Sequence, residues 1–591
     1  MKHPTFKNLA VKFTTAFIFS LAAMTTLAPM PYALARGVNA DSPMGRFEKT
    51  LEAPKPKLEQ FVITLNLRHK FALHRLISEQ ANPRSSHYRQ YLTVSQFTKR
   101  FGPSHRSIAK VLAFIKAYDL KVAGISPNHL VMICEGTMPQ IEAAFPDASI
   151  VVTENGNIGN TFPMSYKGQV VVPERLKGVV NYVSVFGSNT NKPQLFNDTK
   201  VFTKEGGKPE FIYGPKAIST IYHFPNVNDL YAAKAYSGRG ETIAIASYNS
   251  YDLNDIKAFW KIAQIKHTGT ISNVYVNGKP SSGDGSIETT LDLEQASSQA
   301  PGANIRMYLG TSSSDANETL VFNRIVTDNA ASVVSYSWGS CEPQTDKPNI
   351  DIMHEILLEG QAQGIAFFVA SGDSGAYMCS VHKKRTLDVS YPASDPVVTA
   401  VGGTTLYANK YLQMTHQSAW RGSGGGVSWL FKRPGYQFGF GLPTTDSEKD
   451  HTAHRFMCDV SLDANPRTGY FLFFQGQGQI VGGTSAATPN MAALWSLADE
   501  AAKARIGDSN QEIYRIARSI YYHRAFSDVI KGNNRGYRRN FMQLINGVTG
   551  KRTGYYKAHA GYNMPTGWGS PKGSELVRIL AREEELVKAR H

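Results

Sequence analysis

Short apolar runs alternate with helical patterns from about residue 213 onward, and this alternation constrains the fold more than any other feature. Five runs are rich in β-branched or aromatic residues: Thr242–Ser247, Ile305–Leu309, Ser332–Ser337, Ile365–Ala370 and Val397–Val401. Helical patterns lie between them, at Asp292–Gln299, Glu318–Asp328 and Asp351–Gln363. Apolar strands that alternate with helices favour a parallel sheet covered on both faces. The sequence therefore predicts an α/β domain over residues 213–591, with functional groups just beyond the carboxyl ends of its strands.

The preceding residues form a different unit. A strand pattern at Phe61–Leu67 is followed by helical patterns at Phe71–Gln80 and at about Ser107–Tyr118. This mixture predicts a smaller α+β domain over residues 36–187. Residues 188–212 are polar and lack a clear period, which indicates a linker and a natural place for proteolytic cutting.

The N-terminus has the segment order of a secretory signal peptide. Lysines within the first twelve residues precede an apolar run from Phe13 to about Leu27, and an A-x-A pattern ends at Ala35. We therefore expect residues 1–35 to be removed and the chain to be exported, either secreted or periplasmic. An uncleaved membrane anchor is the alternative. No later run reaches the roughly 18 apolar residues that a membrane span needs.

The net charge of +16 does not by itself identify a partner. The basic residues are scattered and no nucleic-acid-binding motif accompanies them, which argues against a nucleic-acid-binding protein. The four cysteines, Cys134, Cys341, Cys379 and Cys458, contain no C-x-x-C pair, which argues against a zinc site. Cys341 and Cys379 each follow a glycine-rich turn, and we expect them to form a disulfide. Free buried thiols are the alternative.

The stretch Gly483-Thr484-Ser485-Ala486 carries the strongest chemical signal. Ser485 opens a helical pattern that runs to about Ala501. At a helix start, a hydroxyl lies beside free backbone N–H groups and the positive end of the helix dipole. A serine hydroxyl is nevertheless a poor nucleophile unless a base takes its proton. A plain helix cap is the alternative, so the choice depends on whether the chain offers a base.

Carboxylates are better candidates for that base than histidines. The segments Gly372–Gly375 and Thr452–His454 are similar to chymotrypsin-like motifs, but their order is wrong and their surroundings alternate strand and helix. The string His267–Thr270 lacks the His-Gly-Thr order of a subtilisin-like site. Glu288 and Asp292 are four residues apart, which places them on one face of a helix. Buried together, they would have separated pKa values and could share a proton. A solvated helix face is the alternative.

An ordered series of motifs now points to a family. In chain order the motifs lie at Glu288–Asp292, Ala300–Ile305, Val333–Gly339, Ala370–Gly375, Tyr391–Leu406, Ser423–Ser428, Asp459–Ala464, Gly483–Ala486 and Thr566–Pro571. Through them the chain resembles the serine-carboxyl peptidases of the sedolisin/kumamolisin family (peptidase family S53), which also includes tripeptidyl-peptidase I. The N-terminal unit is similar to the family's activation propeptide at Asn82–Tyr88 and Tyr91–Thr93. The resemblance implies a subtilisin-like parallel sheet flanked by helices and a smaller, ferredoxin-like α+β propeptide domain.

The resemblance also implies roles for individual residues. Ser485 attacks the scissile carbonyl and forms an acyl-enzyme, Glu288 accepts its proton, and Asp292 supports Glu288. Asp373 donates a hydrogen bond to the oxyanion, which requires a protonated carboxyl because a carboxylate would repel the developing charge. A carboxylate base suits an acidic pH optimum. The residues expected to border the substrate cleft are Ser337, Trp338, Gly339, Gly424 and Gly425.

The family's calcium site near the C-terminus is matched less closely. Asp528 and the Val529 carbonyl align with its first half. The second half offers the carbonyls of His559 and Gly561 and the amide oxygen of Asn563, where the family has an aspartate. Calcium affinity rises with the charge of the ligands, so we expect one calcium ion that is bound more weakly than in the family.

These features predict an exported endopeptidase that acts in acid and is made as a self-activating zymogen. Its expected partners are protein or peptide substrates and its own propeptide as an intramolecular inhibitor, and we expect a monomer. A tripeptidyl aminopeptidase of the same fold is one alternative, because the motifs do not show whether the cleft is closed near the substrate's N-terminus. The other is an inactive homologue that serves as an exported binding protein, against which the retention of all four catalytic residues argues.

Overall fold

The structure is a computed structural model. It describes residues 57–146, 151–153, 165–167, 170–185, 192–193, 212–226, 228, 235–381, 384–439, 454–537, 551–552 and 554–588. The predicted signal peptide and most of the predicted linker lie outside these residues, and so do the expected domain boundaries near residues 36 and 188. Among the described helices, none combines the length and the hydropathy that a bilayer crossing requires.

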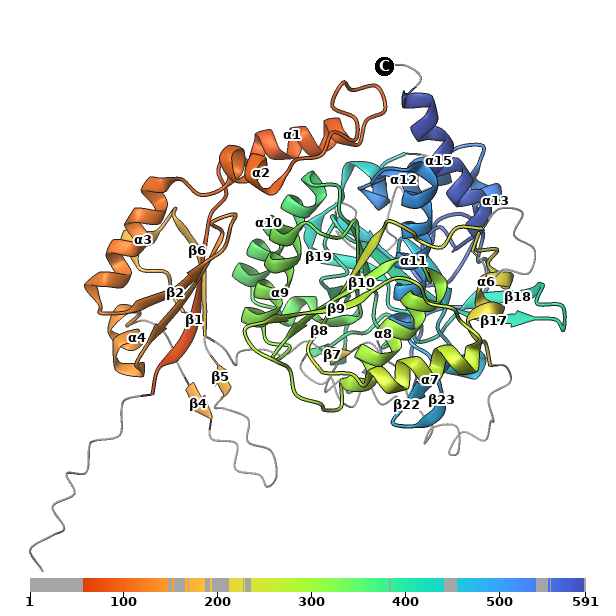
Figure 1. Ribbon diagram of the computed structural model, residues 1–591, viewed down its shortest axis with the longest axis horizontal. Coiled ribbons are helices and arrows are strands. Elements are labelled where there is room, and N and C mark those ends of the chain that lie inside the picture. The colour runs from red at the N-terminus through yellow and green to blue at the C-terminus, as the bar shows by residue number, and fades with distance from the viewer. Residues whose placement is uncertain are drawn as a thin grey trace, which may run out of the picture. The chain divides into compact units, whose positions relative to one another are not determined.

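The larger domain is built on an eight-stranded sheet with the order β18-β17-β13-β11-β8-β10-β9, and β21 pairs with β17 beside this path (Figure 1). The strands are β8 (Thr242–Ser247), β9 (Ile271–Val276), β10 (Asn304–Gly310), β11 (Val333–Tyr336), β13 (Ala366–Ala370), β17 (Thr399–Ala408), β18 (Met414–Ala419) and β21 (Val460–Asp463). Each neighbouring pair is parallel except β17 with β18. The five predicted strands are confirmed as β8, β10, β11, β13 and β17.

Helices cover both faces of this sheet. They are α7 (Leu253–Ala263), α8 (Ser286–Gln299), α9 (Asp315–Asp328), α10 (Lys347–Ala362), α11 (Thr484–Ala502), α12 (Ser509–Ala517) and α15 (Gly573–Lys588). Ile243 and Ile245 of β8 belong to the apolar core that α8 and α11 complete. Ala244 and Ala246, which point to the other face, belong to the core that α9 and α10 complete. The predicted parallel sheet with two helical layers is therefore confirmed.

Helix α8 begins at Ser286, earlier than the helical pattern at Asp292–Gln299 predicts. Its first turns bury polar side chains, among them Glu288 and Thr290, so an apolar period is missing there although the segment is helical. As a result, Glu288 and Asp292 both lie within one helix, one turn apart. The two carboxyl groups therefore lie on one face of a helix, as their spacing predicts.

The smaller domain has a four-stranded sheet in the order β2-β3-β1-β6, with each neighbouring pair antiparallel. Its elements are β1 (Glu59–Leu65), α1 (Lys70–Gln80), α2 (Val94–Phe101), α3 (His105–Ala117), β2 (Lys121–Ile125), β3 (Val131–Gly136), α4 (Met138–Ala144) and β6 (Val180–Val185). This connectivity is the ferredoxin-like arrangement that we expected. Phe61, Phe114 and Met132 contribute to an apolar core of its own.

The remaining elements are short. They are β4 (Val151–Thr153), β5 (Ser165–Lys167), β7 (Lys192–Pro193), α6 (Pro215–Ile221), β12 (Trp338–Cys341), β14 (Ser380–Val381), β15 (Lys384–Arg385), β16 (Ser390–Tyr391), β19 (Gly426–Lys432), β20 (His454–Met457), β22 (Tyr470–Phe474), β23 (Gln477–Val481), α13 (Tyr522–Ala525), β24 (Phe526–Ser527), β25 (Lys551–Arg552) and β26 (Ser570–Pro571). Cys341 and Cys379 form the expected disulfide. Cys134 and Cys458 are buried free thiols.

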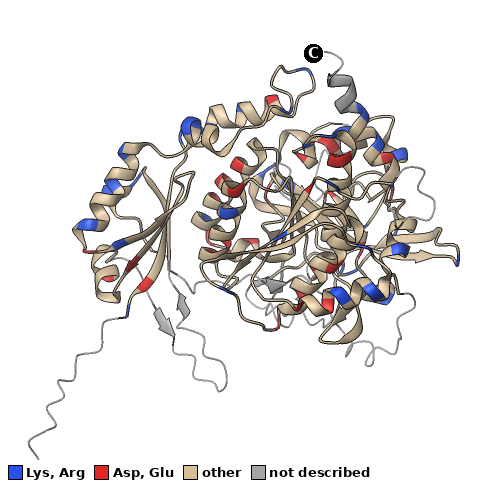
Figure 2. Cartoon of the chain, viewed as in Figure 1, with Lys and Arg blue, Asp and Glu red and all other residues tan. Residues whose placement is uncertain are grey.

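Charged residues of both signs are interspersed on the outer helices (Figure 2). Three surface ion pairs illustrate this pattern, namely Arg324 with Asp328 on α9, Lys347 with Asp351 on α10, and Arg578 with Glu575 on α15. Such pairs give an ordinary mixed surface on these helices and not a basic stripe.

Candidate active site

Helix α8 carries two fully buried carboxyl groups, Glu288 and Asp292. The helix follows Gly285, where an added Cβ would lie 2.6 Å from the Trp338 ring, so only glycine leaves room for that side chain. Both carboxyl oxygens of Glu288 are buried, and no described residue makes a hydrogen bond of ordinary geometry with them. Burying such a group costs free energy. A purely structural role does not explain this carboxyl.

Ser485 is the second residue of α11, which begins at Thr484, one residue before the predicted start. The helix follows Gly483, whose φ of 113° is a conformation that favours glycine. The Ser485 hydroxyl is buried, and no described residue gives it a hydrogen bond of ordinary geometry. It nevertheless lies close enough to Glu288 to lower the pKa of that carboxyl by hydrogen bonding. The candidate nucleophile and the candidate base are therefore neighbours.

Asp373 lies in the loop after β13, and Thr484 ties it to α11, the helix that carries Ser485. The backbone N–H and the hydroxyl of Thr484 both donate to Asp373 Oδ1, at 2.8 and 2.9 Å. The Thr484 hydroxyl in turn accepts a hydrogen bond from the Gly372 N–H at 3.1 Å. Because Oδ1 accepts two hydrogen bonds, Oδ2 is the oxygen suited to carry a proton. Thr484 is not among the site residues that the sequence predicts, although it precedes Ser485 in the motif.

Ser337 follows β11 and connects the two helices of the site. Its hydroxyl donates to Asp292 Oδ1 at 2.6 Å and lies 3.5 Å from the backbone oxygen of Ser485. The sequence predicts that Ser337 borders the substrate cleft, and in the structure its hydroxyl contacts the Asp292 carboxyl. The loops after β11 and β13 thus bring Ser337 and Asp373 to the carboxyl edge of the parallel sheet, as the strand pattern predicted.

Burial dominates the electrostatics of the three carboxyl groups. It raises the pKa of Glu288 well above the ordinary value, and the charges of Asp292 and Asp373 raise it further. Burial also raises the pKa of Asp292 to about 8, against the opposing effect of the Ser337 hydroxyl. The pKa of Asp373 is likewise raised to about 8 by burial, although the hydrogen bonds from Thr484 lower it. Groups with such values hold protons in acid.

The other expected cleft residues lie in two segments. Trp338 and Gly339 are on β12, which pairs antiparallel with β7, so that Trp338 is opposite Pro193 and Gly339 is opposite Lys192. In the second segment the Gly424 N–H donates to the Gly372 carbonyl at 2.7 Å. Added Cβ atoms at Gly424 and Gly425 would lie about 2 Å from the backbone oxygens of Ser371 and Met564 (2.0 and 2.1 Å). Close backbone packing therefore explains both glycines.

The five residues expected to hold calcium also come together. The Gly561 N–H donates to Asp528 Oδ2 at 2.9 Å. The side-chain amide of Asn563 reaches the carbonyls of Val529, His559 and Gly561. The sequence correctly groups these residues, but the amide nitrogen of Asn563, and not its oxygen, faces the three carbonyls.

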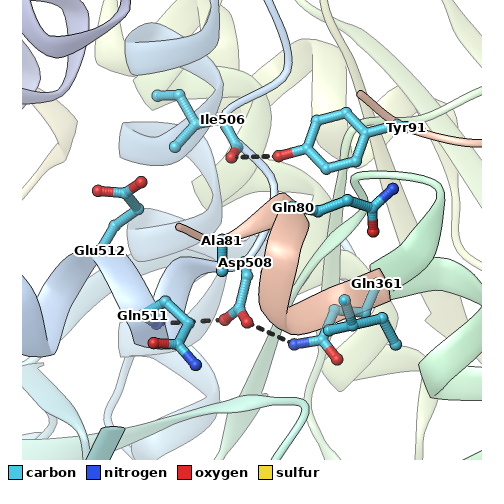
Figure 3. Close-up of a pocket in the computed structure, with 9 residues that line it drawn as sticks. Gln80, Ala81, Tyr91, Gln361, Ile506, Asp508, Gln511 and Glu512 are labelled. Carbon is cyan, nitrogen blue, oxygen red and sulfur yellow. Dashed lines mark hydrogen bonds between the residues drawn. The ribbon is translucent and has the colours of Figure 1, made fainter. Parts of the chain in front are cut away.

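Tyr91 of the smaller domain anchors it to the larger one. Its hydroxyl donates to the Ile506 carbonyl at 2.6 Å. Gly364 and Gly507 have positive φ values of 76° and 80°, and added Cβ atoms there would lie 2.4 and 2.0 Å from Tyr91. Beside this contact, residues of both domains line a small cavity in which the Gln361 amide donates to Asp508 at 2.5 Å (Figure 3). These contacts involve none of the four candidate catalytic residues.

A second set of contacts involves charged groups. The Arg89 guanidinium pairs with Glu512 at 3.0 Å, and both side chains are buried. The Tyr88 hydroxyl donates to the same carboxylate at 3.1 Å. Asn128 donates to Glu359 at 2.6 Å. The smaller domain is thus held by matched polar groups as well as by Tyr91.

Comparisons with known proteins agree with this architecture. The model "Pro-kumamolisin, activation domain" matches residues 46–188, and the model "Subtilase family" matches residues 265–543. The chain is 29% identical to Sedolisin of Pseudomonas sp. (strain 101), with 88% of this chain and 86% of the relative covered. It is 26% identical to Kumamolisin of Bacillus sp. (strain MN-32), with 84% of this chain and 86% of the relative covered.

A solved structure extends the likeness to three dimensions. Pseudomonas sedolisin, a serine-carboxyl proteinase complexed with pseudo-iodotyrostatin, superposes with a TM-score of 0.53 at 28% identity, and covers 63% of this chain and 98% of that one. The fold and the matched models define a subtilisin-like peptidase domain preceded by an activation domain. The chain belongs to the sedolisin and kumamolisin family of serine-carboxyl peptidases and is a pro-form.

Proposed function

We propose that this chain is an exported, acid-acting serine-carboxyl endopeptidase that is made as a self-activating zymogen. One observation carries the proposal. A buried hydroxyl, Ser485 on α11, and a buried carboxyl, Glu288 on α8, are neighbours although neither has a described partner of ordinary geometry. Two such groups cost free energy in a purely structural site, and they suit a nucleophile and its base.

The proposed reaction proceeds through an acyl-enzyme. Ser485 Oγ attacks the carbonyl carbon of the substrate while its proton passes to Glu288, and the proton then goes to the leaving amine as the C–N bond breaks. Water attacks the acyl-enzyme with the same carboxyl as base. Asp292 supports Glu288, because two coupled carboxyls can share one proton and so keep one negative charge at the site.

Asp373 is proposed to donate its proton in a hydrogen bond to the oxyanion. Its pKa, raised to about 8 by burial, supports this role, since the group is protonated below that pH and loses the proton as pH rises through it. Water that enters the cleft after processing would reduce this effect of burial. We therefore expect activity to fall on the alkaline side at or below pH of about 8, and on the acidic side as the Glu288–Asp292 pair becomes fully protonated.

Self-cleavage in the linker is supported by the strand β7. This strand pairs antiparallel with β12, as an extended peptide substrate would. The register places Pro193 opposite Trp338, the residue that follows Ser337, and the Ser337 hydroxyl lies near the Ser485 backbone. We expect the first cut a few residues beyond Pro193.

The test is to shift the purified chain and its Ser485→Ala variant from about pH 7 to about pH 4 and to follow intact mass. The proposal expects only the parent chain to shorten, with a new N-terminus between residues 194 and 212. If neither protein cleaves itself or a peptide at any acidic pH, the binding-protein alternative replaces the proposal.

The same samples separate the two peptidase alternatives. Peptides with a free and with an acetylated N-terminus are incubated with the activated enzyme. Cleavage of internal bonds in both peptides supports endopeptidase action. Release of tripeptides from the free peptide alone supports a tripeptidyl aminopeptidase instead.

A further inference from the structure

The side-chain amide of Asn563 occupies the centre of the group of residues at which calcium is expected. Its Nδ2 donates to the carbonyl oxygens of Val529 and His559, both at 3.1 Å, and lies 3.4 Å from that of Gly561. These are the three carbonyls that would ligate the ion. Asn563 is 1% exposed, so water does not compete for these contacts.

The orientation of this amide is fixed by Thr566. Asn563 Oδ1 accepts a hydrogen bond from the Thr566 N–H at 3.1 Å and another from its hydroxyl at 2.8 Å. In the flipped orientation the amide oxygen would face three carbonyl oxygens, and the NH₂ group would face a backbone N–H. The contacts with the carbonyls and with the Thr566 N–H would then be lost, and only the Thr566 hydroxyl, which can also accept, would keep its contact. The amide oxygen is therefore not available as a metal ligand.

The charge of the set also differs from that of a calcium site. Asp528 is its one carboxylate, and Oδ2 of that group already accepts the Gly561 N–H. Asp528 Oδ1 is buried and makes no hydrogen bond of ordinary geometry with a described residue, and this atom alone suits a cation. The nearby Tyr522 hydroxyl does not supply that bond, because it donates to the Trp568 carbonyl at 3.2 Å. One negative charge with neutral oxygens gives weak calcium binding.

We propose that the Asn563 amide replaces a calcium ion in this chain. Two N–H groups hold the carbonyls of the loops after β24 and before β26, and the fold of this region does not depend on calcium. The aspartate that the family has at this position would instead present an anionic oxygen to the same carbonyls, which requires a cation between them.

The test compares the inactive Ser485→Ala protein with the same protein carrying Asn563→Asp. Calcium binding is followed by calorimetric titration, and thermal unfolding is recorded in EDTA and in millimolar Ca²⁺. For the protein that retains Asn563, we expect no one-site titration and a change in Tm of less than about 1 °C with calcium. We expect N563D to bind one ion and to gain about 5 °C in Tm with calcium. The exposed Asn273→Asp on β9 controls for added charge.

Two results would overturn the proposal. One is a stoichiometric calcium titration and a calcium-dependent Tm in the protein that retains Asn563. The other is a folded N563D protein that neither binds calcium nor loses stability in EDTA. If N563D does not fold, the titration of the protein with Asn563 still decides the question, because it requires no variant at that position.

Discussion

The proposed chemistry depends most on a proton held by Asp373. Asparagine at this position keeps an acceptor for Thr484 and offers an N–H where the acid offers an O–H. We predict that D373N retains activity within about tenfold and loses the alkaline limb of the pH profile, whereas D373A loses activity by about 10²–10³-fold. Initial rates on one peptide between pH 3 and 9 measure both. Equal loss in D373N and D373A would contradict a role as hydrogen-bond donor.

Ser337 is predicted to act as a positioning residue for Asp292. Its hydroxyl lowers the pKa of that carboxyl. In S337A the Glu288–Asp292 pair should therefore hold the shared proton more tightly and lose it only at higher pH. We expect kcat to fall about tenfold to a hundredfold and the acidic limb to move up by about one pH unit. Ser340→Ala on β12, whose hydroxyl contacts Thr345, is the matched control. An unmoved acidic limb in S337A would contradict the assignment.

The sequence is informative about residue types and less so about their partners. Ser485, Glu288, Asp292 and Asp373 stand in motifs, and the structure brings all four to one edge of the sheet. The contact of Thr484 with Asp373 was not predicted. The two residues are more than a hundred positions apart, and no local sequence pattern indicates that they meet. The same holds for the direction in which the Asn563 amide points.

At the scale of elements, the Cys341–Cys379 disulfide joins β12 to the loop after β13. The cysteines are 38 residues apart, and closing a loop of this length restricts the unfolded chain by about 4 kcal/mol. We predict that the double variant C341S/C379S lowers the free energy of unfolding by roughly that amount, measured by urea unfolding in the Ser485→Ala background. A change below about 1 kcal/mol would show that the loops are held by other contacts.

Tyr91 is predicted to control release of the propeptide. Removing its ring from the slot formed by Gly364 and Gly507 should weaken docking by about 3 kcal/mol. Self-cleavage of Y91A should then begin at a pH about one unit higher than in the parent chain, measured by intact mass along a pH series. Phe71→Ala, at an exposed position of α1, is the control. Unchanged processing of Y91A would contradict the anchor role.

The charged contacts of this interface act in opposite directions as the pH falls. Burial tends to raise the pKa of Glu512, but the charges of Arg89 and Arg515 outweigh it and hold the pKa below the ordinary value. A depressed pKa gives stabilisation that is present at neutral pH and is lost in acid. Burial raises the pKa of Asp508 to about 7 and that of Glu359 to about 8, and these groups favour the docked form in acid. Acid release therefore depends on the Arg89–Glu512 pair.

For the whole molecule, the alternation of apolar runs and helical patterns was sufficient to predict the parallel sheet and its two layers. The central strands are apolar along their whole length because helices cover both faces of the sheet, so the sequence alone indicates that they are buried. The first turns of α8 show no apolar period, because polar residues are buried there, and only the spacing of Glu288 and Asp292 indicated a helix. The relation of the linker to β12 was not predicted, because pairing of strands that far apart leaves no local pattern.

The proposed reaction requires that a carboxylate and not a histidine activates Ser485. The most direct measurement is rapid acid quenching of the activated enzyme with a peptide substrate, followed by mass spectrometry of the acylated fragment. We predict an acyl adduct on Ser485 in the parent enzyme at acidic pH, none in S485A, and a rate of acylation in E288Q that is lower by about 10³-fold or more. An adduct on another residue, or acylation in E288Q at the parent rate, would contradict the account.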